Sequence, residues 1–337
     1  MDYFDQTIDQ YRKRLDEIKQ HIEFISLQKN LYNVLKDNSS MDRYSTNLKE
    51  IINSTVQYNS IIICLYGCFE EFIDNIATDY INLINDYSIS YDDLPKSIRD
   101  KHLYKVGEFL SNPQRYKGYN LTVEECINNI YMSINSTDGR KLNMELILSH
   151  AGNLKVDKIS ELFKSLGING LKPRFEDSIN KEKLSLLDEL IDQRNVISHS
   201  WEVEQRISFD IIKEEIIVLL KNLGEVLKNI LLDEVYFFMY ERGLMLPFDA
   251  PINVIHNNIL CINSKNSNLK VMDSILLCRS DGKKERLEII NIQIDNVDVN
   301  KIVEKDIDVG IKVNKKVYLD GEYYYLKGNR DNLINDL

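Results

Sequence analysis

The sequence has little of the positive charge that many nucleic-acid-binding proteins carry. Of its 337 residues, 42 are basic and 53 are acidic, which gives a net charge of −11. A protein that coats nucleic acid through its phosphates usually needs a surplus of lysine and arginine. The deficit argues against such non-specific coating, but it leaves room for a local basic groove.

Signals for membrane insertion and secretion are also missing. No stretch approaches eighteen uninterrupted apolar residues. The amino terminus, MDYFDQTIDQ, is acidic and has no basic segment followed by an apolar run. We therefore expect a cytoplasmic protein with no membrane partner, whose 43% hydrophobic residues supply a packed core.

Metal and phosphate-binding motifs are absent as well. The five cysteines are an odd number spread over the chain without a second pair to complete a zinc site: Cys64, Cys68, Cys126, Cys261 and Cys278. We expect reduced thiols. No Walker-type phosphate loop, Gly-x-Gly-x-x-Gly or His-Glu-x-x-His motif occurs, which excludes the common nucleotide hydrolases and zinc proteases. We expect no cofactor or metal.

Helical periodicity dominates the chain from Asp5 to about Tyr240. Ser208 is a plausible N-cap for the last helix. The predicted helices cover residues 5–36, 43–86, 94–112, 121–133, 141–150, 155–166, 181–200 and 208–240. This part of the chain is predicted to form a large all-α bundle.

The period changes after "ERGLMLPFDAP". Short segments rich in Ile, Val and Tyr follow, separated by turn residues: "NNILCIN", "SILLCRS", "LEIINIQID", "DVGIKVN" and "EYYYLKG". They predict a small antiparallel β domain. The fold class is α+β multidomain, with a helical domain at residues 1–245 and a β domain at residues 246–337.

One arginine interrupts an apolar helical stripe in "LIDQRNVISHSW", residues 190–201. At about 100° per residue, Arg194 falls in the middle of the arc that holds Leu187, Leu190 and Ile197. A guanidinium cannot lose its proton, and burying it unpaired is costly. We therefore expect an anionic partner or a wet groove on that face.

His199 lies on a different side of this helix. It is about 140° from Arg194 with a rise of about 7.5 Å, and Asn195 lies one turn back on the edge of His199. Two arrangements would bring Arg194 and His199 to one groove: a helix distorted near its end, or two copies of this helix side by side. A third interpretation is structural, an ion pair plus a histidine favoured by the helix dipole.

The segment "RNVISH" at residues 194–199 resembles the Arg-x4-6-His motif of the HEPN superfamily, most closely its RiboL-PSP-type branch. The resemblance extends over residues 5–240, including "YNSIIICLYGCFEEFIDNI" and "GNLKVDKISELFKSLGI". Members often have glycine after the histidine, where this chain has Ser200. That departure leaves the Arg, Asn and His positions intact and puts the following turn in doubt.

This resemblance implies a bundle that dimerises through the motif helices and, in many members, a metal-independent endoribonuclease. Arg194 and His199 would be catalytic, and Asn195 would orient the histidine or the phosphate. Ser198 would assist by hydrogen bonding, although an ordinary surface hydroxyl explains it better. The products would be a 2′,3′-cyclic phosphate and a 5′-hydroxyl.

Two hypotheses about function remain open. The first is a dimeric endoribonuclease acting as a toxin or anti-phage effector on RNA such as tRNA, with an antitoxin or sensor as partner. The second is a catalytically inactive HEPN protein that binds RNA, nucleotide or a partner protein. The intact Arg194 and His199 favour the first, whereas the acidic charge and Ser200 favour the second. The four other histidines are predicted to be structural or solvated: His21, His102, His150 and His256.

The carboxyl-terminal segment resembles the second, barrel domain of translation elongation factors. The resemblance rests on "RLEIINIQIDNVDVNKIVEKDIDVGIKVN", with the Ile292–Gln293 pair and Asp308 to Lys312, and covers about 70 residues. It implies an antiparallel β-barrel that binds RNA, tRNA or the translation machinery. A domain used only for assembly is the alternative.

Overall fold

The computed structural model describes residues 4–37, 39–52, 54–135, 142–149, 152–200, 203–264, 269–302 and 306–326. The chain divides into two compact units, residues 2–230 and residues 231–337. The division falls inside the last helix, whereas the sequence predicts a domain boundary near residue 246. No helix within the described ranges is long and apolar enough to cross a bilayer.

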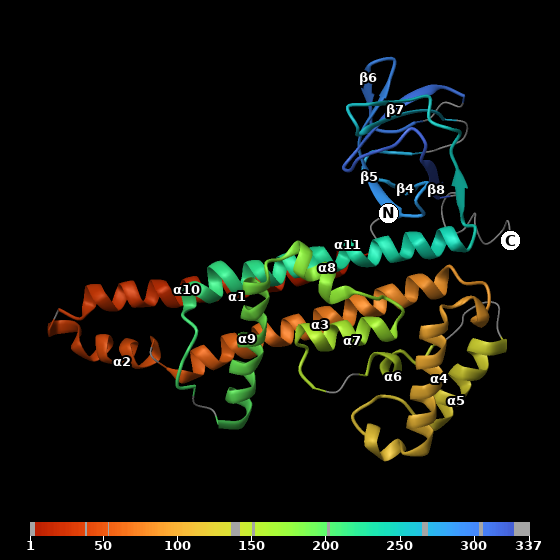
Figure 1. The fold of residues 1–337 in the computed structure, drawn as a ribbon. Helices are drawn as coiled ribbons and strands as arrows, with labels where there is room; N and C mark the ends of the chain where they lie inside the picture. Colours follow the sequence, from red (N-terminus) through yellow and green to blue (C-terminus); the bar gives the residue numbers. More distant parts are fainter. Residues whose placement is uncertain are drawn as a thin grey trace. The chain divides into compact units, whose positions relative to one another are not determined.

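Three long helices form the centre of the helical unit (Figure 1): α1 (Asp5–Leu35), α3 (Thr55–Asp86) and the first part of α11 (Ile217–Glu241). The rings of Tyr11 on α1 and Phe72 on α3 stack with centroids 4.0 Å apart. A Cβ atom at Gly224 of α11 would lie 3.2 Å from the Tyr11 ring. The absence of a side chain at Gly224 therefore lets α11 approach this aromatic pair closely.

The helix predicted at residues 43–86 is two helices, α2 (Asp42–Ile52) and α3. Ser54 has an extended backbone, with φ −61° and ψ 128°, and its hydroxyl accepts the Val56 N–H at 3.2 Å. This is an ordinary N-cap. The prediction of one continuous helix was wrong because the apolar pattern continues across the cap.

The other predicted helices are present, with the predicted bounds for residues 181–200 and with shifted ends for the rest. Ser208 caps the last of them by accepting the Ile211 N–H at 3.2 Å. They are α4 (Lys96–Ser111), α5 (Val123–Asn135), α6 (Met144–Leu148), α7 (Val156–Ser165), α9 (Lys181–Ser200), α10 (Phe209–Ile211) and the π-helical turn η4 (Ile212–Ile216) that leads into α11. The helix α8 (Leu171–Ser178) was not predicted. Its Pro173 suppresses the helical signal, although proline is tolerated in a first turn.

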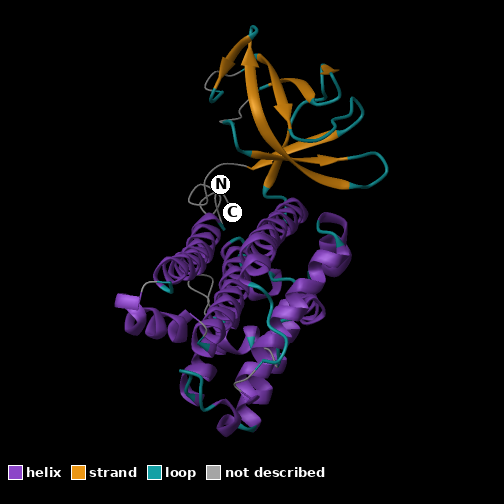
Figure 2. Ribbon diagram, turned by 90° about the vertical axis from the view of Figure 1, so that its left-hand side faces the viewer, coloured by secondary structure: helices purple, strands orange, loops and turns teal. Residues whose placement is uncertain are grey.

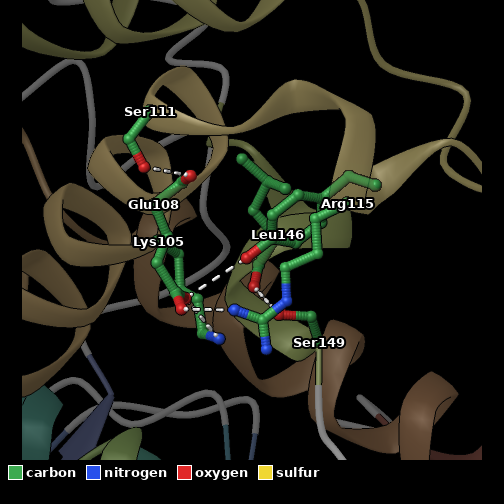
Figure 3. A network of polar contacts seen from close by, with 7 residues as sticks. Lys105, Glu108, Ser111, Arg115, Leu146 and Ser149 are labelled. Carbon is green, nitrogen blue, oxygen red and sulfur yellow. Dashed lines mark hydrogen bonds and ion pairs between the residues drawn. The ribbon is translucent and has the colours of Figure 1, made fainter.

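A polar cluster ties α4 to the short helix η3 (Pro113–Tyr116) (Figure 3). The Glu108 carboxylate accepts hydrogen bonds from Lys105 Nζ at 3.0 Å and Tyr116 Oη at 3.2 Å, and it pairs with Arg115 at 3.6 Å. These donors, Lys105 first, hold the pKa of Glu108 below its usual range. The cluster fixes the turn that follows α4.

The sheet unit is antiparallel throughout, as predicted, and Figure 2 shows its strands in orange. The strand order is β1-β8-β4-β5-β7-β3-β2, with β6 paired to β5. The strands are β1 (Met245–Pro247), β2 (Asn253–Ile255), β3 (Ile259–Asn263), β4 (Ser274–Cys278), β5 (Lys284–Ile294), β6 (Val297–Val299), β7 (Asp308–Val313) and β8 (Glu322–Leu326).

The predicted barrel is not formed, because the sheet is open. The strands at its two ends, β1 and β2, do not pair with each other in the part of the chain that the structure describes. The long strand β5 changes partner along its length, from β4 to β7, with a register shift between Ile289 and Asn291. Each end strand has three residues, and the described pairing joins β1 to β8 and β2 to β3.

A buried arginine joins the last turns of α11 to the strands within the sheet unit. Arg286 of β5 is 8% exposed, and its Nε donates to Asp233 Oδ1 at 2.9 Å. Its Nη1 donates to Ser274 Oγ at 3.1 Å. A carboxylate therefore neutralises the Arg286 guanidinium.

Candidate functional site

The helix α9 carries all four predicted site residues. It buries the apolar positions that the sequence assigned to its core face: Leu184, Leu187, Leu190, Ile191 and Ile197. It remains α-helical through Ser200. The alternative in which a distorted helix end brings His199 next to Arg194 is therefore wrong.

Arg194 is half-buried and lies against the ring of Tyr66 on α3, with its guanidinium carbon 4.6 Å from the ring centroid. Its Nη1 donates to Asn153 Oδ1 at 3.3 Å and to Asn195 Oδ1 at 3.4 Å, which are long hydrogen bonds. Among the residues that the structure describes, no carboxylate pairs with it. The expected anionic partner is thus replaced by neutral groups, and the full positive charge remains to attract an anion.

Tyr66 is fixed in place beneath this arginine. Its ring is 2% exposed, and its hydroxyl donates to Glu70 Oε1 at 3.1 Å and accepts the Leu154 N–H at 3.4 Å. Burial raises the pKa of Tyr66 above its ordinary value, so the phenol stays neutral at physiological pH. These two hydrogen bonds hold the ring in position against Arg194.

Asn153 is a site residue that the sequence analysis did not single out. It precedes α7 in a segment that is also tied to α9 by the ion pair between Lys155 Nζ and Asp192 Oδ1 at 2.7 Å. No spacing rule links it to Arg194. The one available signal was its place in "GNLKVDKISELFKSLGI", the segment that carries part of the family resemblance.

The structure brings Asn195 to Arg194 and leaves His199 apart. Asn195 is half-buried and accepts a hydrogen bond from the arginine rather than orienting the histidine. His199 is exposed, and no described side chain joins it to Arg194. Within the described part of a single chain, no hydrogen bond links the two groups.

Ser198 is exposed, and its hydroxyl donates to the Arg194 carbonyl oxygen at 3.0 Å. A serine inside a helix often bonds the carbonyl four residues back. This bond occupies the proton of the hydroxyl, so Ser198 can offer only acceptor lone pairs to a ligand. The contact fits the interpretation of an ordinary surface serine.

Three of the four other histidines lie within the described residues, and none of these three belongs to a metal-binding group. His102 is fully buried; its Nε2 accepts the Asn143 N–H at 3.2 Å, and its Nδ1 lies 3.0 Å from Tyr91 Oη. Burial lowers the pKa of His102 to about 4, so it is a neutral structural residue. His21 and His256 are exposed, and His150 lies outside the described residues. No group of three His, Cys, Asp or Glu side chains within the described ranges is placed to hold a metal ion.

Comparison with known proteins agrees with the motif. The family model for the RiboL-PSP-HEPN domain matches residues 9–233, which include α9 and both segments that contact Arg194. No curated protein matches the chain. The match covers more than half of the sequence and every residue of the candidate site, and the chain therefore belongs to the RiboL-PSP-HEPN family.

Proposed function

We propose that the protein is a metal-independent endoribonuclease that acts as a dimer, with Arg194 and His199 as its catalytic residues. The observation that carries the proposal is the environment of Arg194, a half-buried arginine whose partners are all neutral in the described part of the chain. Such a charge is available to an RNA phosphate. The exposed His199 lies on the same helix and supplies an acid/base group.

Membership of the family supports the same class of function. A HEPN domain indicates a nuclease or another RNA-related function, and HEPN domains are often ribonucleases. We further propose that this chain cleaves RNA such as tRNA in a toxin or anti-phage role. An antitoxin or sensor protein and the sheet unit would then control when the enzyme acts and on which RNA.

The proposed reaction uses the 2′-hydroxyl of the RNA as nucleophile. A histidine removes its proton, the 2′-oxygen attacks the adjacent phosphorus, and the 5′-oxygen leaves with a proton from an acid. The new bond gives a 2′,3′-cyclic phosphate, and the broken bond gives a 5′-hydroxyl. Arg194 donates to the phosphate oxygens, whose negative charge increases in the transition state.

A dimer would supply the second acid/base group. Each chain has one histidine in the motif, while the reaction gains from both a base and an acid. Val196, one turn before His199, is 42% exposed and gives α9 an apolar point of contact for a second copy. In a twofold pair of α9 helices, the two His199 side chains would line one groove.

A catalytically silent protein that binds RNA, nucleotide or a partner is the second candidate. The observation in its favour is that no hydrogen bond from a described residue orients the His199 ring in the single chain. The acidic net charge of −11 also favours the catalytically silent protein. The two candidates differ in one measurable property, which is turnover of RNA.

The test is incubation of the purified protein with total RNA and tRNA in the presence of EDTA, followed by analysis of the RNA ends. We expect fragments with 2′,3′-cyclic phosphates, and a loss of about 10²- to 10⁴-fold in rate for His199→Ala. His21→Ala, at another exposed histidine of the same unit, is the matched control and should cleave at the normal rate. Equal cleavage by the wild type and His199→Ala, or none by either, would refute the nuclease proposal.

The dimer is tested separately by placing a charge on the proposed contact. Val196→Asp should lower both the dimer fraction in light scattering and the cleavage rate. Val218→Asp on α11 is the matched control, because Val218 is also 42% exposed. A Val196→Asp protein that stays dimeric and active would contradict assembly through α9.

A further inference from the structure

A cavity of about 430 Å³ in the helical unit lies away from the Arg194 side chain. Its walls come from α1, the junction between α2 and α3, and residues 206–210 at the start of α10. The volume falls within the range of small-molecule sites, about 300–1,000 Å³. The lining residues that bear on chemistry are Lys29, Ser54, Tyr58, Arg206, Phe209 and Asp210.

Two cations at this cavity are held by neutral groups. Arg206 Nη2 donates to Thr55 Oγ1 at 2.8 Å, and its guanidinium carbon lies 5.2 Å from the Tyr58 ring centroid. Lys29 Nζ lies 5.6 Å from the Phe209 ring centroid. Neither forms an ion pair with any side chain that the structure describes. A phosphate group is an anion that suits two such cations lining one cavity.

The other lining groups suit the remainder of a nucleotide. Phe209 is half-buried, and its ring already lies near Tyr58, with centroids 6.0 Å apart, and near Lys29 Nζ. A base would stack on the part of the ring that these neighbours leave exposed. Asp210 is exposed and accepts hydrogen bonds, which matches the hydroxyls of a ribose. A carboxylate would weaken the binding of a bare phosphate, so its presence beside the cations favours a ligand that also carries donors.

The wall of the cavity is connected to the helix that carries Arg194. The Tyr58 hydroxyl accepts the Ile207 N–H at 3.0 Å and donates to Gln193 Oε1 at 2.9 Å. Gln193 Nε2 donates in turn to the Gln205 carbonyl oxygen at 2.6 Å. A ligand that holds Arg206 would therefore also hold the segment bonded to Gln193, the residue before Arg194.

We propose that this cavity binds a nucleoside phosphate, with its phosphate on Lys29 and Arg206, its base against Phe209 and its ribose donating to Asp210. The nucleotide comes either from the free pool or from within an RNA chain, since the chemistry of recognition is the same. This inference stands whether or not the chain cleaves RNA. It adds a second binding site to the candidate site on α9.

The experiment measures binding by calorimetry to the full-length His199→Ala protein, so that cleavage cannot alter the probe. The probes are AMP, GMP, inorganic phosphate and a ten-nucleotide single-stranded RNA. We expect AMP or GMP to bind more tightly than inorganic phosphate. Arg206→Gln and Lys29→Gln should each weaken binding by about tenfold or more. Lys13→Gln is the matched control, because Lys13 is an exposed lysine nearer the start of α1. This variant should leave the affinity unchanged.

A second variant separates stacking from charge. Phe209→Leu should weaken binding of AMP or GMP by about fivefold or more and leave inorganic phosphate unaffected. Binding of RNA alone, weakened by Arg206→Gln, would assign the cavity to a nucleotide within RNA. Binding of AMP or GMP that RNA does not displace would assign it to a free nucleotide. Absence of binding by all probes, or affinities unchanged in Arg206→Gln and Lys29→Gln with folding intact by circular dichroism, would overturn the proposal.

Discussion

Arg194 in the helical unit is half-buried and Arg286 in the sheet unit is buried, and their partners differ in charge. Arg286 is the more deeply buried and pairs with the Asp233 carboxylate. Arg194 rests on the Tyr66 ring and contacts two asparagine side chains. The charge of Arg286 is balanced by a carboxylate of its own unit. The charge of Arg194 has no carboxylate partner among the described residues.

This difference is the basis for assigning Arg286 a structural role and for proposing a functional role for Arg194. Removing one member of a buried ion pair leaves an uncompensated charge, so Arg286 is required for stability. An arginine on an aromatic face contributes about 0.5–1 kcal/mol when it is exposed and about 2 when desolvated. On the proposed function, the contacts of Arg194 add little to the stability of the fold and leave its charge for a phosphate.

Arg194→Ala should give the largest effect of this comparison. On the proposed mechanism it removes the donor to the transition-state phosphate, and the cleavage rate should fall by about 10³-fold. The free energy of unfolding should fall by only about 1 kcal/mol. Cleavage assays and urea denaturation measure the two quantities. A large loss of stability with normal cleavage would reverse the assignment of the two arginines.

Arg286→Met should show the opposite profile. It removes the Arg286 guanidinium from Asp233, and the sheet unit should lose about 3 kcal/mol of unfolding free energy. This is the lower end for broken buried pairs, because Asp233 is partly exposed. Cleavage under conditions where the protein is folded should stay normal. Adding Asp233→Leu should restore part of the stability, because it removes the unpaired charge. If that double variant is less stable than Arg286→Met, the ion pair does not explain the loss.

Local sequence signals predicted most of the secondary structure. The five strands with strong Ile, Val and Tyr content are present, and the long helices follow their apolar spacing. The break at Ser54 was missed because one cap residue hardly changes a period of 3.6 residues. The predicted barrel was wrong for a different reason, since the sheet is open. Pairing of β1 with β2 would depend on the path of the whole sheet, including the register shift in β5. The pattern of residues within a single strand does not encode that path.

Of the candidate site, only the residues on α9 could be predicted from the sequence. The position of Arg194 within an apolar arc identified it as anomalous without any knowledge of its surroundings. Its partners Tyr66 and Asn153 come from separate segments, and helical spacing cannot show which elements pack together. The expectation of an anionic partner or a wet groove followed from the cost of burying a charge, and it did not consider an aromatic face.

The Tyr66 ring offers the finest test of the comparison, because its hydroxyl and its aromatic face can be removed separately. Tyr66→Phe keeps the face but leaves the Leu154 N–H without the phenol, which should cost about 1 kcal/mol of stability with little change in cleavage. Tyr66→Leu also removes the face and should lower the cleavage rate by a further factor of about three. Urea denaturation and initial cleavage rates of the two variants, measured in parallel, give the difference that belongs to the ring. If both variants lose the same activity, the hydroxyl and its bond to Leu154 position Arg194, and the neutral aromatic partner is not what distinguishes it from Arg286.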